Sequence, residues 1–406
     1  MSLNGRHGRQ HRASVSAEEE LALLLCGTQE RRRRAQDRIE QLAGAVEFDS
    51  LSALLARQNV MFIAYYRLLE AAPESVPGHI RNLLTDFAAL RSRRGLMTEA
   101  LALQFQADLE REGVPTLPLK GPLLSRDLYG DPGMRSTIDL DLLVPPEQLD
   151  LAVRTIAARG YLLRPDVNQM NGLPLFHELL IHDAGLLLPV ELHWRVHWYE
   201  TRFSRGMLDR SVDTPDGRRA RAEDELASLL LIYARDGFVG LRLAADIATW
   251  WDRHGHVAKT PMLDATAADY PEVGQALGAT ASLLEDLVGV PRRSLLSDPD
   301  RPSWRQRTAV HLANWEGVGD PDQVTANVTF VDWLLAIRGG WLGFARRTMV
   351  PPRAKLVQMY GLPEKARLRR CWWRLAHGPK LMIRYLMALW RIRGGRRWVP
   401  FPQSLR

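Results

Sequence analysis

The stretch LPLKGPLLSRDLYGDPGMRSTIDLDLLV, residues 117–144, decides the expected fold and site. Its end, TIDLDLLV, alternates and then becomes apolar, which predicts a buried strand. Asp139 and Asp141 lie two positions apart there, so their side chains point to one face, while Leu140 and Leu142 point into a core. Two neighbouring carboxylates repel each other, and a hard divalent cation such as Mg²⁺ relieves that repulsion by taking oxygen ligands.

Upstream of the two aspartates, Lys120 and Gly121 stand between a predicted edge strand, residues 114–119, and a predicted helix, residues 121–129. Glycine lets the backbone approach a ligand closely, and the first turn of a helix favours phosphate. A lysine adds a compact positive charge that suits phosphate oxygens, although a surface lysine at a helix start would look the same. We expect both residues to contact the phosphates of a nucleotide.

A third carboxylate follows in PVELHW, residues 189–194, where Glu191 has apolar neighbours that point to the opposite face of a predicted strand. His193 in the same strand is either a ligand or base, or a histidine whose hydrogen bonds are satisfied beside the next tryptophan. His177 and His182, on the preceding predicted strand, are interpreted as structural or solvent-facing.

This arrangement resembles the nucleotidyltransferase superfamily of the polymerase-beta type. In that superfamily a Gly-containing strand-to-helix turn precedes an Asp-x-Asp strand and a third carboxylate on a neighbouring strand. It resembles more closely an uncharacterised bacterial nucleotidyltransferase family in which Leu-Lys-Gly replaces the usual Gly-Ser turn. The residues that carry this resemblance are Leu119, Lys120, Gly121, Tyr129, Asp131, Pro132, Gly133, Arg135, Asp139, Asp141, Glu191, Leu192, His193 and Trp194. The sequence departs from the family in having Glu where Asp is more usual at the third carboxylate, and in having no histidine at residues 232–238.

The resemblance implies an α+β fold, in which a small central mixed sheet of the nucleotidyltransferase type is flanked by N-terminal and C-terminal helical regions. It also implies a divalent cation, Mg²⁺ or Mn²⁺, and an NTP substrate such as ATP. The implied catalytic residues and metal ligands are Asp139, Asp141 and Glu191. The implied nucleotide-binding residues are Lys120, Gly121 and Arg135, and the possible substrate-site residues are His193, Arg242 and Asp246.

Two of these residues have structural alternatives. Arg135 either contacts the nucleotide or forms an ion pair with Asp131 that holds the loop between them. Asp246 lies four residues after Arg242 on a predicted helix, so it either belongs to the substrate site or pairs with that arginine.

Changes in hydrophobic pattern and charge divide the 406 residues into five parts. Apolar residues at spacings of three and four predict helices before residue 113, one of them over residues 50–69, and again from residue 223 onward. The expected parts are a disordered basic tail (1–15), an N-terminal helical domain (16–112), a nucleotidyltransferase catalytic core (113–200), a C-terminal helical domain (201–364) and a basic, aromatic, amphipathic tail (365–406).

The net charge of +7 is concentrated at the end of the chain. Residues 365–406 contain 12 Lys and Arg and no Asp or Glu, which leaves 42 basic and 47 acidic residues, a net of −5, in the rest. This tail either packs on the acidic body as an amphipathic helix, which we expect, or binds an anionic membrane surface or RNA. The charge gives no reason to expect that the whole protein binds nucleic acid.

Cysteine usage and hydropathy favour the cytoplasm. Cys26 and Cys371 are too few for a disulfide framework or a four-cysteine metal site, and no signal peptide is recognised. No apolar run reaches the roughly 18 residues of a membrane span. No Walker-type phosphate loop, zinc-ligand spacing or Gly-x-Ser-x-Gly elbow occurs in the sequence, which disfavours ATPases, zinc hydrolases and serine hydrolases.

These observations predict an enzyme that transfers a nucleoside monophosphate from an NTP to a hydroxyl-bearing acceptor and releases pyrophosphate. The acceptor would be a peptide or protein, a small metabolite or a natural product. Two alternatives stay open: a toxin or modifier that acts on tRNA or protein, and a non-catalytic adaptor that binds a nucleotide or a peptide. Clustered carboxylates are costly without a cation, which favours the enzyme.

Overall fold

The structure is a computed structural model. The residues that it describes are 15–164, 175–198, 200–255, 261–297 and 303–312, with short pieces between 324 and 387. The predicted disordered tail lies outside the described residues except at its last position, and so does most of the predicted amphipathic tail. Within the latter, residues 376–383 are helical, with Leu381 buried and Met382 and Ile383 exposed.

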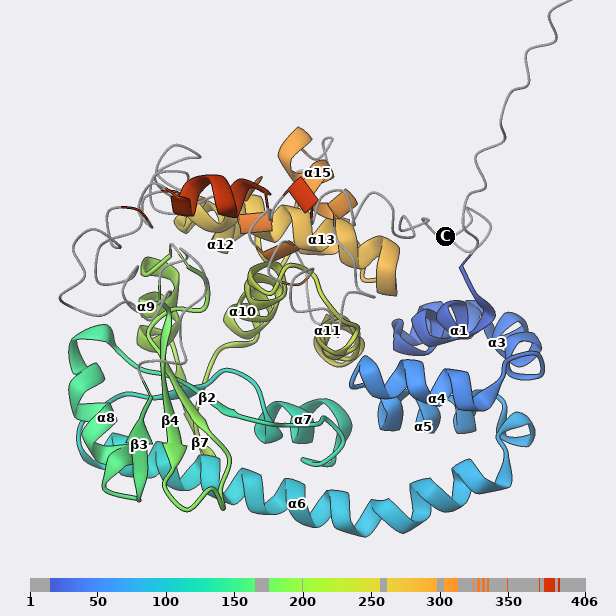
Figure 1. Ribbon diagram of the computed structural model, residues 1–406, viewed down its shortest axis with the longest axis horizontal. Coiled ribbons are helices and arrows are strands. Elements are labelled where there is room, and N and C mark those ends of the chain that lie inside the picture. The colour runs from blue at the N-terminus through green and yellow to red at the C-terminus, as the bar shows by residue number, and fades with distance from the viewer. Residues whose placement is uncertain are drawn as a thin grey trace, which may run out of the picture.

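Helices precede the sheet, as the periodicity predicts. They are α1 (Ala17–Cys26), α2 (Gln29–Arg34), α3 (Gln36–Ala43), α4 (Phe48–Arg57), α5 (Met61–Ala71) and the 34-residue α6 (Gly78–Arg111), with the 3-10 helix η1 (Pro73–Ser75) before α6. The prediction of one helix over residues 50–69 is wrong, because Asn59 adopts a left-handed conformation (φ 55°) that separates α4 from α5. Figure 1 shows α6 running along the base of the molecule, from the N-terminal helices to the sheet.

A five-stranded sheet follows. Its strands are β1 (Leu117–Pro118), β2 (Leu140–Leu143), β3 (Tyr161–Leu163), β4 (His177–His182) and β5 (Val190–His193), in the spatial order β1-β2-β5-β4-β3. β2 and β5 run parallel, whereas the other neighbouring pairs are antiparallel, so the small mixed sheet of the expected α+β fold is confirmed. The edge position predicted for residues 114–119 is confirmed by β1, where Pro118 has no N–H to donate to a central ladder.

The apolar face of the sheet packs on α6 and on α8 (Leu149–Ala157), which follows the 3-10 helix η2 (Pro146–Gln148). The buried residues of this cluster include Leu140, Leu142, Leu180, Val190 and Leu192 from the strands, and Phe105, Leu109, Ala152 and Ile156 from the two helices. Because strand side chains alternate between faces, this packing turns Asp141 and Glu191 to the opposite face.

Helices also follow the sheet. They are α9 (Arg202–Asp209), α10 (Ala222–Arg235), α11 (Arg242–His254), α12 (Asp264–Asp269), α13 (Gly274–Val288), α14 (Arg292–Leu295) and α15 (Trp304–Leu312), with the 3-10 helix η4 (Pro271–Val273) before α13. Residues of α1, α4, α5, α10, α11 and α13 share one buried apolar cluster, so helices from both ends of the chain pack together. Within the described part of the chain, no helix combines the length and apolar composition needed to cross a bilayer.

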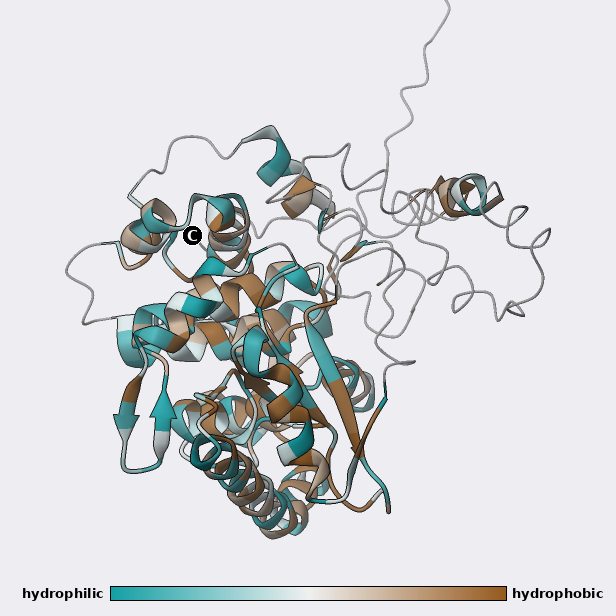
Figure 2. Cartoon of the chain, turned by 90° about the vertical axis from the view of Figure 1, so that its left-hand side faces the viewer, coloured by the Kyte–Doolittle hydropathy of each residue, from teal (hydrophilic) through white to brown (hydrophobic). Residues whose placement is uncertain are grey.

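A two-stranded hairpin of β6 (Val212–Thr214) and β7 (Gly217–Arg219) has no counterpart in the sequence-based expectation. The Asp216-Gly217 pair indicates the turn, but each strand has three residues and none of the six is buried. Such strands show no apolar alternation for a pattern to detect. Figure 2 shows the hairpin standing out from the body with mainly hydrophilic residues.

Helix α6 and the loop before β2 touch at two glycines. A Cβ atom at Gly95 would lie 2.3 Å from the backbone nitrogen of Gly133, and one at Gly133 would lie 2.3 Å from the carbonyl oxygen of Arg91. Backbone atoms cannot rotate away as a side chain can. Glycine at both positions therefore allows this loop to lie directly against the helix.

We expect Gly95→Ala to lower the free energy of unfolding by about 1–3 kcal/mol, the typical cost of adding a carbon to a packed site. Gly78→Ala is the matched control, because Gly78 lies in the same helix and its Cβ would meet nothing within 4 Å. Urea unfolding followed by circular dichroism measures both. A Gly95→Ala protein as stable as the control would contradict the close contact.

Candidate active site

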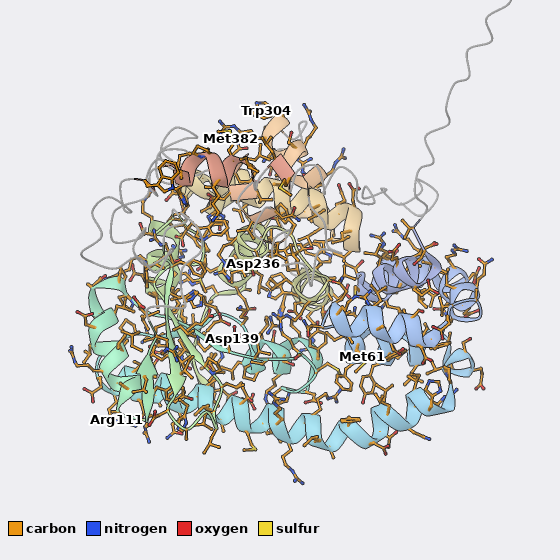
Figure 3. All side chains as sticks on the ribbon, in the orientation of Figure 1. Met61, Arg111, Asp139, Asp236, Trp304 and Met382 are labelled. Atoms are coloured by element: carbon orange, nitrogen blue, oxygen red, sulfur yellow. The ribbon has the colours of Figure 1, made fainter. Side chains whose placement is uncertain are left out.

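The three predicted carboxylates converge on one face of the sheet, and we call Asp139, Asp141 and Glu191 the carboxylate site. Asp141 in β2 and Glu191 in β5 are register partners in the parallel pair, and Asp139 directly precedes β2. One oxygen of each carboxylate lies within 4.8 Å of the others. In Figure 3, Asp139 lies in the middle of the molecule between the sheet and α7 (Pro122–Tyr129). The strand begins later than predicted, at residue 140 rather than 137, but the two aspartates still lie close together.

The turn from β1 into α7 brings Lys120 to these carboxylates. The N–H of Leu119 donates to the carbonyl of Asp141 at 3.1 Å, which extends the β1–β2 pairing toward the turn. Gly121 has φ 92° and ψ −146°, a conformation that favours glycine, and Pro122 begins the helix. The ammonium of Lys120 lies 3.2 Å from Oδ2 of Asp141, with both side chains largely buried. The lysine is therefore not a surface residue.

Two histidines adjoin the carboxylates. The fully buried His193 places Nε2 2.9 Å from Oδ1 of Asp141 and 3.1 Å from Oε2 of Glu191. His177 in β4 has Nδ1 3.7 Å from the same Glu191 oxygen. His182, at the other end of β4, instead packs against the ring of Tyr161. The interpretation of His177 as structural or solvent-facing thus misses its position beside Glu191, whereas that of His182 fits the structure.

The two aspartates differ in their pKa values. Burial raises the pKa of Asp139, and the charge of Asp141 raises it further. Burial would also raise the pKa of Asp141, but the charge of Lys120 and the hydrogen bond with His193 outweigh it and hold that pKa well below its usual range. Burial opposes ionisation of Glu191 too, yet its hydrogen bond with His193 leaves its pKa lowered.

The carboxylate site fits a divalent cation. Its donor atoms are carboxylate oxygens that converge within 4.8 Å of one another. Oδ2 of Asp141 faces the ammonium of Lys120 at 3.2 Å, and the raised pKa of Asp139 marks a second charge that its neighbours compensate poorly. Oxygen donors of this kind suit Mg²⁺ and Mn²⁺.

A buried ion pair anchors the loop that leads into β2. Nε of Arg135 donates to Oδ2 of Asp246 at 2.7 Å, and the hydroxyl of Tyr129 lies 2.8 Å from Oδ1 of the same carboxylate. Both charged side chains are at most 2% exposed. The pair joins the loop and the end of α7 to α11, because Asp246 belongs to that helix.

The partners of these residues differ from the alternatives that the sequence suggests. Asp246 pairs with Arg135 and not with Arg242, whose Nη1 donates to a backbone carbonyl of the same loop at 3.1 Å. Asp131 pairs with Arg91 of α6 at 2.8 Å and not with Arg135. Neither alternative pairing forms, because Asp246 and Asp131 each meet a partner from a distant part of the chain.

A pocket of about 300 Å³ lies beside this loop. Its walls come from α5, α6 and the loop, and include Phe62, Phe87, Leu90, Arg91, Arg94 and Thr137. Phe87 and Leu90 are exposed, and Arg94 has no acidic partner among the described residues. Thr137 in its wall lies two residues before Asp139 in the chain.

We expect Asp246→Ala to lower the free energy of unfolding by about 3–5 kcal/mol, because the change leaves the buried guanidinium of Arg135 without its partner. Glu147→Ala is the control, since its ion pair with Arg205 lies at the surface and such pairs contribute about 0–1 kcal/mol. Denaturant unfolding compares the two variants. Equal losses would show that the buried pair is no anchor.

The pKa shifts predict opposite effects of neutralising the two aspartates in a chelating buffer. The raised pKa of Asp139 means that its ionised form weakens the folded state, a penalty that is absent at low pH and grows as the pH rises above 3.8. Asp139→Asn should therefore raise the melting temperature at pH 7. Asp141→Asn should lower it, because the lowered pKa of Asp141 gives stability that is present above 3.8 and lost at lower pH.

Thermal unfolding between pH 3 and pH 8 measures these effects. The gain of Asp139→Asn over the wild type should shrink as the pH falls, and Mg²⁺ should stabilise the wild type more than the variant. A higher melting temperature for Asp141→Asn than for Asp139→Asn at pH 7 would contradict the assigned directions of the two pKa shifts.

Comparison with known proteins gives one match. A family model described as an uncharacterised nucleotidyltransferase matches residues 44–289, more than half of the 406 residues. The match spans the sheet, the carboxylate site and the helices α10 and α11. No curated protein and no solved structure matches the chain. The resemblance expected from the Leu-Lys-Gly, Asp-x-Asp and Glu-Leu-His-Trp motifs is confirmed, and the chain belongs to this uncharacterised nucleotidyltransferase family.

Proposed function

We propose that the chain transfers a nucleoside monophosphate from an NTP to a hydroxyl-bearing acceptor and releases pyrophosphate. The observation that carries the proposal is the convergence of the three carboxylates of the carboxylate site, with Lys120 of the strand-to-helix turn pointing at them. Membership of a nucleotidyltransferase family supports nucleotidyl transfer in general.

In this proposal, Asp139, Asp141 and Glu191 hold Mg²⁺ or Mn²⁺. Such a cation neutralises charge on the triphosphate and lowers the pKa of an acceptor hydroxyl. The acceptor oxygen forms a bond to the α-phosphorus, the bond from that phosphorus to its bridging oxygen breaks, and pyrophosphate leaves. Glu191, with 19% of its side chain exposed against 1% for Asp141, is the more accessible carboxylate to take the hydroxyl proton.

Other residues of the site would bind the phosphates and position the carboxylates and the loop before β2. Lys120 and the N–H of Gly121 would hold the β and γ phosphates, since the lysine already points into the site and the glycine lies at a helix start. His193 contacts two of the carboxylates and would fix their orientation. Arg135, which the resemblance implies as nucleotide-binding, and Asp246, which it implies as a possible substrate-site residue, form a buried pair that would position the loop before Asp139.

The pocket beside the loop supports an acceptor with an apolar part. Phe87 and Leu90 offer apolar surface, and Arg94 offers a positive charge, in the pocket beside the loop that leads to Asp139. Peptides, proteins, metabolites and natural products can all meet this requirement, and a modifier of tRNA or protein would use the same chemistry. A non-catalytic adaptor is less well supported, because an adaptor has no need of converging carboxylates. Contact of residues 365–406 with RNA or an anionic membrane stays an alternative to the expected packing of this tail on the body.

We expect Asp139→Asn and Asp141→Asn to abolish transfer, since each removes a charged cation ligand while keeping the size of the side chain. Asp150→Asn is the control, because Asp150 is exposed on α8. The assay follows Mg²⁺-dependent incorporation of label from each of the four α-labelled NTPs into a lysate, together with pyrophosphate release. Near-full activity of either site variant would refute the assignment.

A further inference from the structure

Next to the carboxylate site lies a second group of donor atoms, formed by His177, Glu191 and His193, which we call the histidine site. One donor atom of each residue lies within 4.8 Å of the others. Nε2 of His193 and Nδ1 of His177 lie 3.1 Å and 3.7 Å from the same Glu191 oxygen. Ligands about 2.1 Å from a tetrahedral cation are about 3.4 Å apart, so both distances are close to those of a formed site.

The sheet fixes these residues in position. His177 and His193 are register partners in the antiparallel β4–β5 pair, and Glu191 lies two residues from His193 on the same face. The ring of Phe176 packs on both histidines, with centroid separations of 4.4 Å to His177 and 5.6 Å to His193. The guanidinium of Arg235 lies 4.4 Å from the Phe176 ring on top of this stack. Strand register and ring packing therefore hold the two imidazoles toward Glu191 with little freedom to turn away.

We propose that the histidine site binds a transition-metal dication of the Zn²⁺ class, adjacent to the carboxylate site and sharing Glu191 with it. The dication would take the place of the proton that Nε2 of His193 shares with Asp141 and Glu191. Two imidazole nitrogens and one carboxylate suit Zn²⁺, whereas three carboxylates suit Mg²⁺. The two sites thus differ in the cation that they select. Three protein ligands also leave a fourth position of a tetrahedral cation open to water or substrate.

The two sites share Glu191 but would retain their cations differently. A site of nitrogen and oxygen ligands binds Zn²⁺ more tightly than Mn²⁺ in the usual order for divalent metals, and imidazole ligands suit Zn²⁺. The histidine site would keep its cation between turnovers, whereas the carboxylate site would exchange Mg²⁺ together with the nucleotide. Binding at the histidine site also needs no NTP, so it can be measured separately from the proposed transfer reaction.

The test uses metal-stripped full-length protein without nucleotide. Calorimetric titration with Zn²⁺ should give one tight site in the wild type. His177→Ala should weaken it by more than about 100-fold, since even partners outside the first ligand shell contribute 10- to 100-fold. His182→Ala is the matched control, because His182 lies in the same strand but packs on Tyr161, and it should bind Zn²⁺ like the wild type.

A second measurement does not depend on any variant. Co²⁺ added to the wild type should give the intense visible absorption of a tetrahedral site with nitrogen ligands, and Zn²⁺ should displace it while Mg²⁺ should not. Equal Zn²⁺ affinity of His177→Ala and the wild type, or a weak octahedral Co²⁺ spectrum, would overturn the proposal. Mg²⁺-dependent transfer would be unaffected by that result, whereas loss of transfer with an intact Co²⁺ spectrum would refute the proposed function alone.

Discussion

The buried carboxylate of Asp141 needs compensating charge, and the core of the structure is arranged to supply it. Its side chain is 1% exposed, and an ion of this kind without partners costs several kcal/mol. Lys120 reaches it from the turn after β1, and His193 reaches it from β5. The order of β1, β2 and β5 is therefore fixed by electrostatics as well as by the backbone ladder, and Asp139 is left as the carboxylate with the weakest compensation.

The helices that surround the sheet also contribute to the site, because one of them, α11, holds the loop before β2. Asp246 lies 111 positions after Arg135 in the chain, yet the two form the buried pair that holds the loop before β2. Asp246 can do this because α11 belongs to the apolar cluster that the N-terminal helices share with α10 and α13. The regions before and after the sheet thus hold the loop before β2 as one packed body, although they are far apart in the sequence.

What the sequence predicts well is local. The turn at Gly121, the helix predicted over residues 121–129 and the paired aspartates all follow from spacings of a few residues, and the resemblance that implies the fold class and the family rests on these motifs. The place of His177 depends on the register between β4 and β5, which sets it opposite His193 and which the sequence alone does not specify. Arg135 and Asp246 leave no periodic signal, so the sequence offers only the nearer Arg242 as an alternative partner for Asp246. The roles of the site residues in catalysis stay predictions.

Helix α6 gives the molecule a stiff mechanical link. Its 34 residues span about 50 Å at 1.5 Å per residue. Ile80 and Leu84 near its start pack in the cluster of the N-terminal helices, whereas Phe105 and Leu109 near its end pack under the sheet. Gly95, between them, contacts the loop before β2. A tilt of the N-terminal helices would therefore move α6 and, through the contact at Gly95, shift that loop.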